Sequence, residues 1–262
     1  MSKIKLLSIV LPYFNKRQLL MNTLQAIAHF KKNYPIEVVI VDDASTQKIN
    51  DVKSLFPGLD ITLITIGRNP VTWRGPVVAY NIGFNAAKGD VIMINGTDCF
   101  HMGDIIGYVF ENFKPNSYLS FSAYRGLSLP DGLLDNVKWE NNAILKGIYS
   151  HFDVKNKDNW HVHSQFLNYL IPFVAVLWRS DMEALSGMDE RFEIGIGFDD
   201  NDFIDRIRNL GLEMILLDEP FCVHQKHPPT VYSNDINFRL YTKLRRTEPN
   251  RVKAVTNKMY RR

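Results

Sequence analysis

Gly187-Met-Asp-Glu-Arg-Phe-Glu-Ile-Gly-Ile-Gly-Phe-Asp-Asp-Asn-Asp-Phe203 is the stretch from which both the fold and the chemistry can be argued. Apolar residues recur at helical spacing over 203–210, so a helix is expected there, with Asp199, Asp200 and Asp202 at or near its N-terminus. Three carboxylates this close repel one another, so backbone N–H groups, a cation or a reacting proton must compensate. An acidic N-cap on a surface helix is the plainer alternative.

The beginning of the chain predicts a doubly wound α/β fold. Residues 6–11 and 37–41 have the apolar character of buried strands, and residues 16–30 between them have the periodicity of an amphipathic helix. Ligands bind beyond the carboxyl ends of the strands in such a unit, so the turns Pro12-Tyr-Phe-Asn15 and Asp42-Asp-Ala-Ser45 should face one crevice. A simple cap for the next helix, expected over 49–55, is the alternative for the second turn.

Later segments extend the same pattern. Further strands are expected over 61–66, 90–95, 173–178 and 214–217, and a helix over 77–88, while 67–76 is too rich in Gly, Pro and Arg for regular structure. Residues 118–166 are polar and irregular, which suggests an insertion that frames an acceptor site or acts as a lid.

Composition limits the class of protein. The chain has 262 residues, 45% hydrophobic content and a net charge of +3, which fits a soluble α/β domain and is too little charge to indicate nucleic-acid binding. No apolar run reaches the roughly 18 residues of a membrane-spanning helix. The short apolar run near the N-terminus lacks a cleavage site, and the two cysteines, Cys99 and Cys222, form no disulfide framework, so we expect a cytoplasmic protein.

The motifs together resemble the inverting GT-A glycosyltransferases of family 2, with a C-terminal motif similar to that of galactosyltransferases and chondroitin polymerases. The similarity covers about residues 4–228 and rests on Gly-Met-Asp-Glu, the acidic stretch of 197–203, Pro-Tyr-Phe-Asn, Val-Asp-Asp-Ala-Ser and Asn81-x-Gly-x-x-x-Ala-x-Gly89. It implies a GT-A fold with a mixed, mostly parallel sheet flanked by helices. It also implies a metal-assisted transferase that moves a sugar from a nucleotide donor, most often a UDP-sugar, to a hydroxyl of a glycan or lipid-linked acceptor.

The resemblance also implies which residues bind the nucleotide. They are Pro12, Tyr13, Asn15, Asp42, Asp43 and Asn81, with a carboxylate of the second turn bonding the uracil edge. Tyr80 stands where the family usually has Arg, and Arg74 or Arg68 is expected to supply that positive charge.

The catalytic and metal-binding residues follow from the same resemblance. Asp200 matches the general base that deprotonates the acceptor, and Asp199 matches the acid that contacts the acceptor. The family's Asp-x-Asp, which holds Mn²⁺ or Mg²⁺, falls on Gly96 and Asp98, so only the second acid is kept. His224 matches a further metal ligand. The weaker alternatives are His227 as a ligand, and Asn95 and His101 as nearby polar groups or, for His101, a residue at a helix start.

Assignments outside these motifs are weaker. Trp160 is a candidate platform for sugar stacking and His163 a candidate acceptor contact, although isolated histidines are commonly structural. We expect a domain over 1–232, with a nucleotide-binding half of about 1–115 and an acceptor half of about 116–232. The basic extension over 233–262 is either a solvated helix pair or a surface for peripheral membrane contact. A GT-A domain that only binds sugar nucleotide or glycan, or a nucleotidyltransferase, are the rival functions.

Overall fold

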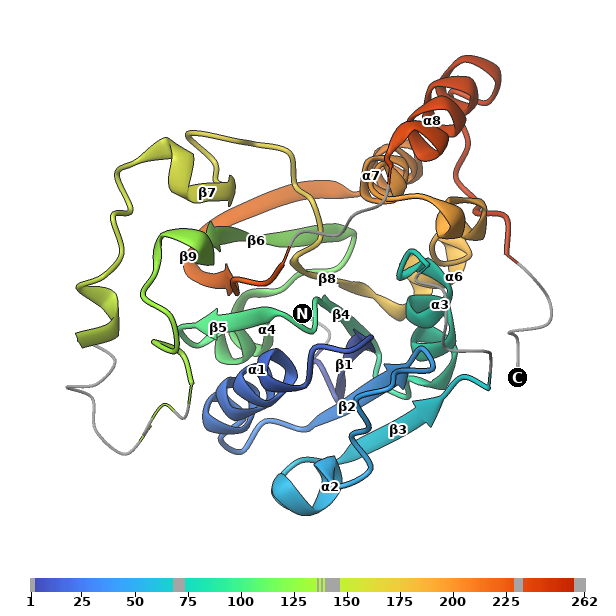
Figure 1. The fold of residues 1–262 in the computed structure, drawn as a ribbon. Coiled ribbons are helices and arrows are strands. Elements are labelled where there is room, and N and C mark those ends of the chain that lie inside the picture. The colour runs from blue at the N-terminus through green and yellow to red at the C-terminus, as the bar shows by residue number, and fades with distance from the viewer. Residues whose placement is uncertain are drawn as a thin grey trace.

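The computed structural model describes residues 3–67, 74–135, 137, 139, 147–228 and 233–256. A single sheet of nine strands runs through this part of the chain, in the order β3-β2-β1-β4-β8-β6-β9-β5, with β7 paired to β6 (Figure 1). No helix in the described ranges is long and apolar enough to cross a bilayer.

The first half of the sheet is parallel, as the sequence predicts. Strands β1, β2, β3 and β4 pair in parallel, and β1 and β2 are almost entirely buried because helices cover both of their faces. The elements of this half are β1 (Leu7–Tyr13), α1 (Arg17–Phe30), β2 (Ile36–Asp42), α2 (Val52–Leu55), β3 (Ile61–Thr65), α3 (Val77–Ala86) and β4 (Val91–Asn95).

The second half is mixed. Strand β8 is antiparallel to β4 and β6, β9 runs parallel to β6, and β5 is antiparallel to β9. The strands are β5 (Cys99–Met102), β6 (Ser117–Arg125), β7 (Trp160–Val162), β8 (Val174–Trp178) and β9 (Glu213–His224). The helices are α4 (Ile105–Asn112), α6 (Arg179–Leu185), α7 (Asp199–Leu210) and α8 (Asp235–Thr247), with 3-10 turns at Gly126–Ser128, Lys157–Asn159 and Glu190–Ile194.

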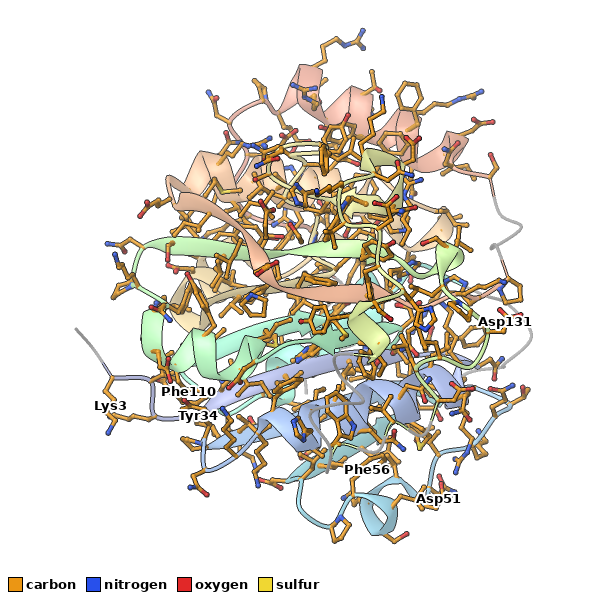
Figure 2. All side chains as sticks on the ribbon, turned by 90° about the vertical axis from the view of Figure 1, so that its left-hand side faces the viewer. Lys3, Tyr34, Asp51, Phe56, Phe110 and Asp131 are labelled. Atoms are coloured by element: carbon orange, nitrogen blue, oxygen red, sulfur yellow. The ribbon has the colours of Figure 1, made fainter. Side chains whose placement is uncertain are left out.

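Alternating residues of the strands divide the core between two faces of the sheet. In β1, Ile9 and Leu11 face the side covered by α1 and α4, while Val10 faces the side covered by α3, α6 and α7. Side chains fill the space between the layers, and at one edge the ring of Tyr34 stacks on that of Phe110 with ring centroids 4.7 Å apart (Figure 2). The two-sided core leaves the strand ends as the place where polar groups can gather.

The C-terminal region packs on the rest of the fold. Helix α8 lies against α7 (Figure 1), and the chain after it runs along residues 185–190. There Ala254 N–H donates to the Leu185 carbonyl at 2.8 Å, and Glu190 N–H donates to the Val255 carbonyl at 3.0 Å. One helix followed by an extended segment is therefore seen over 233–256, in place of the helix pair that composition suggests.

Candidate active site

Two turns at the carboxyl ends of β1 and β2 form the floor of the site. The Asn15 side-chain oxygen accepts hydrogen bonds from the N–H groups of Thr46 and Gln47, at 2.8 and 3.0 Å, and Ser45 N–H donates to Asp42 at 2.8 Å. Tyr13 donates its hydroxyl to the Gln47 carbonyl at 2.6 Å. These contacts join the turns, so these three predicted nucleotide-binding side chains hold the crevice in shape.

A cleft of about 290 Å³ opens beside this floor. Its lining includes the predicted nucleotide residues Pro12, Tyr13, Asp43 and Arg74, and also Tyr80. Arg74 bonds Asp43 through two nitrogens, with its Nη2 2.8 Å from Oδ1 and its Nε 3.0 Å from Oδ2. The predicted charge from the 67–76 loop is thus delivered to the cleft, paired with a carboxylate. Arg68 lies outside the described residues.

A cluster of possible metal ligands lies at one end of the cleft. Asp98 precedes β5 and His224 ends β9, and the pairing of Cys99 with His224 in the antiparallel ladder brings them together. Asp98 Oδ2 lies 3.6 Å from His224 Nε2 and 3.2 Å from His227 Nε2, and the two imidazole nitrogens are 3.4 Å apart. Asp98 and His224, the two ligands predicted from the sequence, are therefore close together, and His227 is the third member of the cluster.

The donor set fits a divalent cation. Ligand atoms about 2.1 Å from one ion are about 3.0 Å apart in octahedral and about 3.4 Å apart in tetrahedral geometry, close to the separations in this cluster. One carboxylate oxygen and two imidazoles are ligands that Mn²⁺ accepts. Burial by itself would raise the pKa of Asp98, but His224, His227 and Lys16 outweigh it and hold that pKa well below the usual value, so the ligand is ionised.

Packing explains why the family's first acid is a glycine here. A Cβ on Gly96 would lie 2.7 Å from Cys99 Sγ, closer than side-chain carbons approach such an atom, and would make a tight contact of 3.0 Å with Asp98 Oδ1. His227 offers a third potential ligand atom beside Asp98 and His224.

Helix α1 holds both halves of the cluster in place. Gln225, between the two histidines, is 3% exposed and donates to the Leu19 carbonyl at 3.0 Å, while its oxygen accepts from Asn22 at 2.9 Å. Thr23 donates to the Thr97 carbonyl at 2.9 Å, next to Asp98. The separation between carboxylate and imidazoles is therefore set by a buried polar network anchored on one helix.

The acid pair lies in the first turn of α7. Phe198 precedes it with a φ of 62°, and Asp199 and Asp200 are half-buried. Burial raises the pKa of Asp199 to about 6, and burial followed by repulsion from Asp199 raises the pKa of Asp200 well above the usual value. A carboxylate with such a raised pKa is suited to accept a proton near neutral pH.

Tyr80 connects the acid pair with the metal cluster. It lines the cleft and is 6% exposed, and its ring stacks on Phe84. Burial first, and then the nearby Cys99, Asp200, Asp98 and Asp199, raise the pKa of Tyr80 well above its ordinary value. A single phenol that lines the cleft is therefore within electrostatic reach of both acidic centres.

Asn81 has a different environment from the one the motif implies. Its amide donates to the Met188 carbonyl and to Glu190, both at 2.8 Å, and its oxygen accepts from Met188 N–H at 2.8 Å. Gly187, with a φ of +73°, allows this approach, since a Cβ there would lie 2.3 Å from the Asn81 oxygen. Asn81 thus fixes the segment that leads to the acid pair, and it is not among the residues that line the cleft.

Two of the weaker assignments change with the structure, and a third stays a prediction. Trp160 is 2% exposed and packs edge to face on Tyr124 and Phe221, so the prediction of a sugar-stacking platform is wrong. Residue His101 begins no helix: it is fully buried in β5 and bonds Asn95 at 2.7 Å, and burial lowers the pKa of this imidazole to about 3. This contact pairs His101 Nε2 with Asn95 Oδ1 in the core, while His101 Nδ1 has no hydrogen-bond partner among the described residues. His163 lies 3.7 Å from Asp218, and its acceptor role stays a prediction.

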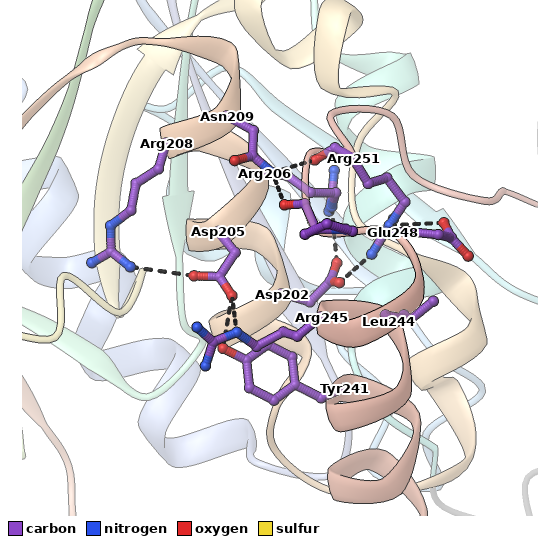
Figure 3. A pocket seen from close by; sticks show the side chains of 11 residues that line it. Asp202, Asp205, Arg206, Arg208, Asn209, Tyr241, Leu244, Arg245, Glu248 and Arg251 are labelled. Carbon is purple, nitrogen blue, oxygen red and sulfur yellow. Dashed lines mark hydrogen bonds and ion pairs between the residues drawn. The ribbon is translucent and has the colours of Figure 1, made fainter.

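A second cavity, of about 200 Å³, lies between α7, α8 and residues 248–251 (Figure 3). Its charged side chains neutralise one another: Asp202 bonds Arg206 at 2.8 Å and also bonds Arg251, while Asp205 pairs with Arg208 and accepts from Tyr241. The residues that line this cavity thus join α7, which carries the acid pair, to α8 and to the segment that follows it.

Two site residues escaped sequence reasoning. Lys16 directly follows Asn15 in a turn that the fold pattern already places at the crevice, so its position was a usable signal. Arg251 reaches Asp189 at 2.7 Å and Asp202 from a segment about fifty residues further along the chain, and no local pattern indicates that contact.

Comparisons with known proteins agree with this geometry. A sequence model described as glycosyl transferase family 2 matches residues 8–168. A sequence search found no match among curated proteins. Because the matched region ends at residue 168, the likeness of the C-terminal motif to galactosyltransferases and chondroitin polymerases stays a prediction.

Solved structures show the same fold. The mannosyltransferase PcManGT from Pyrobaculum calidifontis, in complex with GDP-Man and Mn²⁺, is 20% identical with a TM-score of 0.58, over 88% of this chain and 59% of that one. S. aureus TarS 1-349 in complex with UDP-GlcNAc is 15% identical with a TM-score of 0.59, over 86% of this chain and 59% of that one. This chain thus spans about three fifths of the length of these structures, and the predicted GT-A architecture is confirmed. With the family model covering more than half of its residues, the chain belongs to glycosyl transferase family 2.

Proposed function

We propose that this protein is an inverting glycosyltransferase that uses a UDP-sugar and a divalent cation, Mn²⁺ or Mg²⁺. The observation that carries the proposal is that Tyr80, which lines the cleft together with Asp98, is within electrostatic reach of both Asp98 and the Asp199–Asp200 pair. The two similar structures, solved with GDP-Man and Mn²⁺ and with UDP-GlcNAc, support a nucleotide-sugar donor.

The residues divide the work. Asp98, His224 and His227 would hold the cation, which supplies positive charge against the departing diphosphate. Asp200 takes the proton of the acceptor hydroxyl while that oxygen bonds the anomeric carbon and the bond from this carbon to the diphosphate breaks. A single displacement of this kind inverts the configuration. Burial, and after it repulsion from Asp199, keep the pKa of Asp200 high enough for proton transfer. Asp199 also contacts the acceptor.

The choice of uridine rests on the turn after β2. A carboxylate of Asp42 or Asp43 would accept the uracil N3–H and would be unpaired against cytosine, whose N3 is an acceptor. UDP should therefore compete with a bound fluorescent nucleotide about ten-fold better than CDP does. Equal competition would remove the uridine assignment and leave the transferase proposal standing.

Asp200→Asn tests the transferase itself. The amide keeps the shape of the carboxylate but cannot accept the proton, so donor affinity measured by calorimetry should stay near that of the wild type. Transfer measured by UDP release should fall about 10²–10⁴-fold. A near-normal rate would exclude Asp200 as the base and make Asp199 the next candidate.

A domain that binds sugar nucleotides without turnover is the second candidate, and Gly96 in place of an acid is the observation that favours it. The same assay separates the two. Wild-type protein that binds UDP but releases none from any UDP-sugar, with Mn²⁺ and a broad acceptor panel, would establish the binding module.

We also propose that the acceptor side contacts an anionic membrane surface through α8. Arg239, Lys243 and Arg246 are exposed on its outer face, and Ile236 and Phe238 are 53% and 51% exposed near its start. Such a helix fits peripheral binding to a surface that carries a lipid-linked acceptor. Flotation with vesicles containing phosphatidylserine should recover wild-type protein and lose Phe238→Ser; equal recovery of both would contradict the proposal.

A further inference from the structure

Lys16 contacts two of the three atoms that a cation would need. Its ammonium nitrogen lies 2.6 Å from Asp98 Oδ2 and 3.1 Å from His227 Nε2. The Lys16 ammonium therefore places a positive charge at the position where a divalent cation would bind.

Lys16 and a divalent ion would use the same atoms. Asp98 Oδ2 and His227 Nε2 are 3.2 Å apart, and the single ammonium nitrogen of Lys16 contacts both of them. An ion held by the same carboxylate oxygen and imidazole nitrogen would bring a second positive charge to within about 4 Å of that ammonium, where like charges repel. The two cations therefore oppose each other's binding at this pair of atoms.

The Lys16 side chain has open space beside the cluster into which its ammonium group can move. Its side chain is 32% exposed, and it lines both the donor cleft and a second, open cavity of about 650 Å³ bounded by Asn15, Gln47 and His227. The flexible four-carbon stem of lysine lets the ammonium move without a change in the backbone. In the donor cleft it would join Arg74 as a second cationic group facing the diphosphate.

We propose that Lys16 and the divalent cation compete for Asp98 and His227, and that arrival of the cation releases Lys16 toward the donor diphosphate. The inference rests on the proposed function for the identity of the site. It makes Lys16 a residue that ties metal binding to donor binding: the free protein binds the ion weakly, and a nucleotide that attracts the released ammonium strengthens ion binding.

Direct Mn²⁺ titration of the purified protein, followed by electron paramagnetic resonance without any nucleotide, tests the competition. Lys16→Met removes the competing charge and should bind Mn²⁺ about ten-fold or more tightly than the wild type, because the ion no longer breaks a charged hydrogen bond. Lys16→Arg restores a competing cation and should return the affinity toward the wild-type value. A merely structural role for Lys16 would instead leave Mn²⁺ affinity unchanged or weaken it.

Lys32→Met is the matched control, because Lys32 forms an exposed pair with Asp104 and should leave Mn²⁺ affinity unchanged. Lys16 starts α1 without a side-chain cap bond, so its replacement should not disturb the helix; Lys16→Gln repeats the titration if the Met variant is unstable. Mn²⁺ affinity in the Lys16 variants equal to or below that of the wild type would overturn the competition. Asp98→Asn tests the site separately: unchanged Mn²⁺ binding in that variant would refute the metal site of the proposed function.

UDP provides the second readout. With saturating Mn²⁺, Lys16→Met should bind UDP about ten-fold more weakly than the wild type, since one cationic contact to the diphosphate is lost. Tighter Mn²⁺ binding with unchanged UDP affinity would overturn the proposed transfer of Lys16 to the donor.

Discussion

Asp199→Asn should stabilise the folded protein at alkaline pH and have little effect in acid. Burial raises the pKa of Asp199 from 3.8 to about 6. Between these values the unfolded chain releases a proton that the folded chain retains, so stability falls as pH rises from about 4 to 6 and stays lower above that range. A pKa raised from 3.8 to about 6 corresponds to about 3 kcal/mol for a fully buried group, and solvent screening of the partly exposed carboxyl lowers this to about 1–3 kcal/mol.

The measurement is urea unfolding of wild type and variant at pH 4 and pH 8, with EDTA present at both. Asn cannot ionise, so the variant should exceed the wild type by about 1–3 kcal/mol at pH 8 and by much less at pH 4. Asp60→Asn, at an exposed site, is the control and should change stability by under about 0.5 kcal/mol at either pH. A gain for Asp199→Asn that is no larger at pH 8 than at pH 4 would refute the reasoning.

Two further variants probe the supports of the site. Arg251→Met removes charged bonds to Asp189 and Asp202 and should lower the free energy of unfolding in urea by about 2–4 kcal/mol. The control Arg208→Met breaks only a surface pair and should cost about 0.5 kcal/mol or less. Similar losses in the two variants would contradict a supporting role of Arg251. Gln225→Leu removes the hydrogen bonds that hold the segment between His224 and His227 on α1, but it removes no ligand. Mn²⁺ binding, measured by calorimetry, should weaken about ten-fold. An unaltered affinity would contradict a role of Gln225 in positioning the two imidazoles.

Local pattern was enough to predict the parallel half of the sheet. Strands β1, β2 and β4 are buried on both faces, so their apolar runs stand out against the helices between them. Strand β5 was missed because it has only four residues and includes a histidine, and its strand character comes from pairing with β9. Such pairing joins residues far apart in the chain and leaves no periodic signal around residue 99.

Some residues of the candidate site could be predicted from local motifs, and others could not. Motifs placed Asp98, His224 and the acid pair at strand ends and at a helix start, where topology then gathers them. Trp160 was misjudged because an aromatic residue next to two histidines looks like a binding surface, yet its ring is covered by the partners Tyr124 and Phe221. Lys16 and Arg251 depend on side-chain reach across the fold, which residue spacing does not encode.

The brace on α7 has a consequence for the order in which the protein is made. Asp202 and its partner Arg251 are 49 residues apart, so at about 5–20 residues per second the ribosome adds Arg251 several seconds after the helix that it secures. During that interval the parallel half of the sheet is already complete in sequence, while the acid-bearing helix waits for its last support. Nascent chains stalled before residue 251 should therefore present a formed crevice between the first two turns beside a loosely held acid-bearing helix.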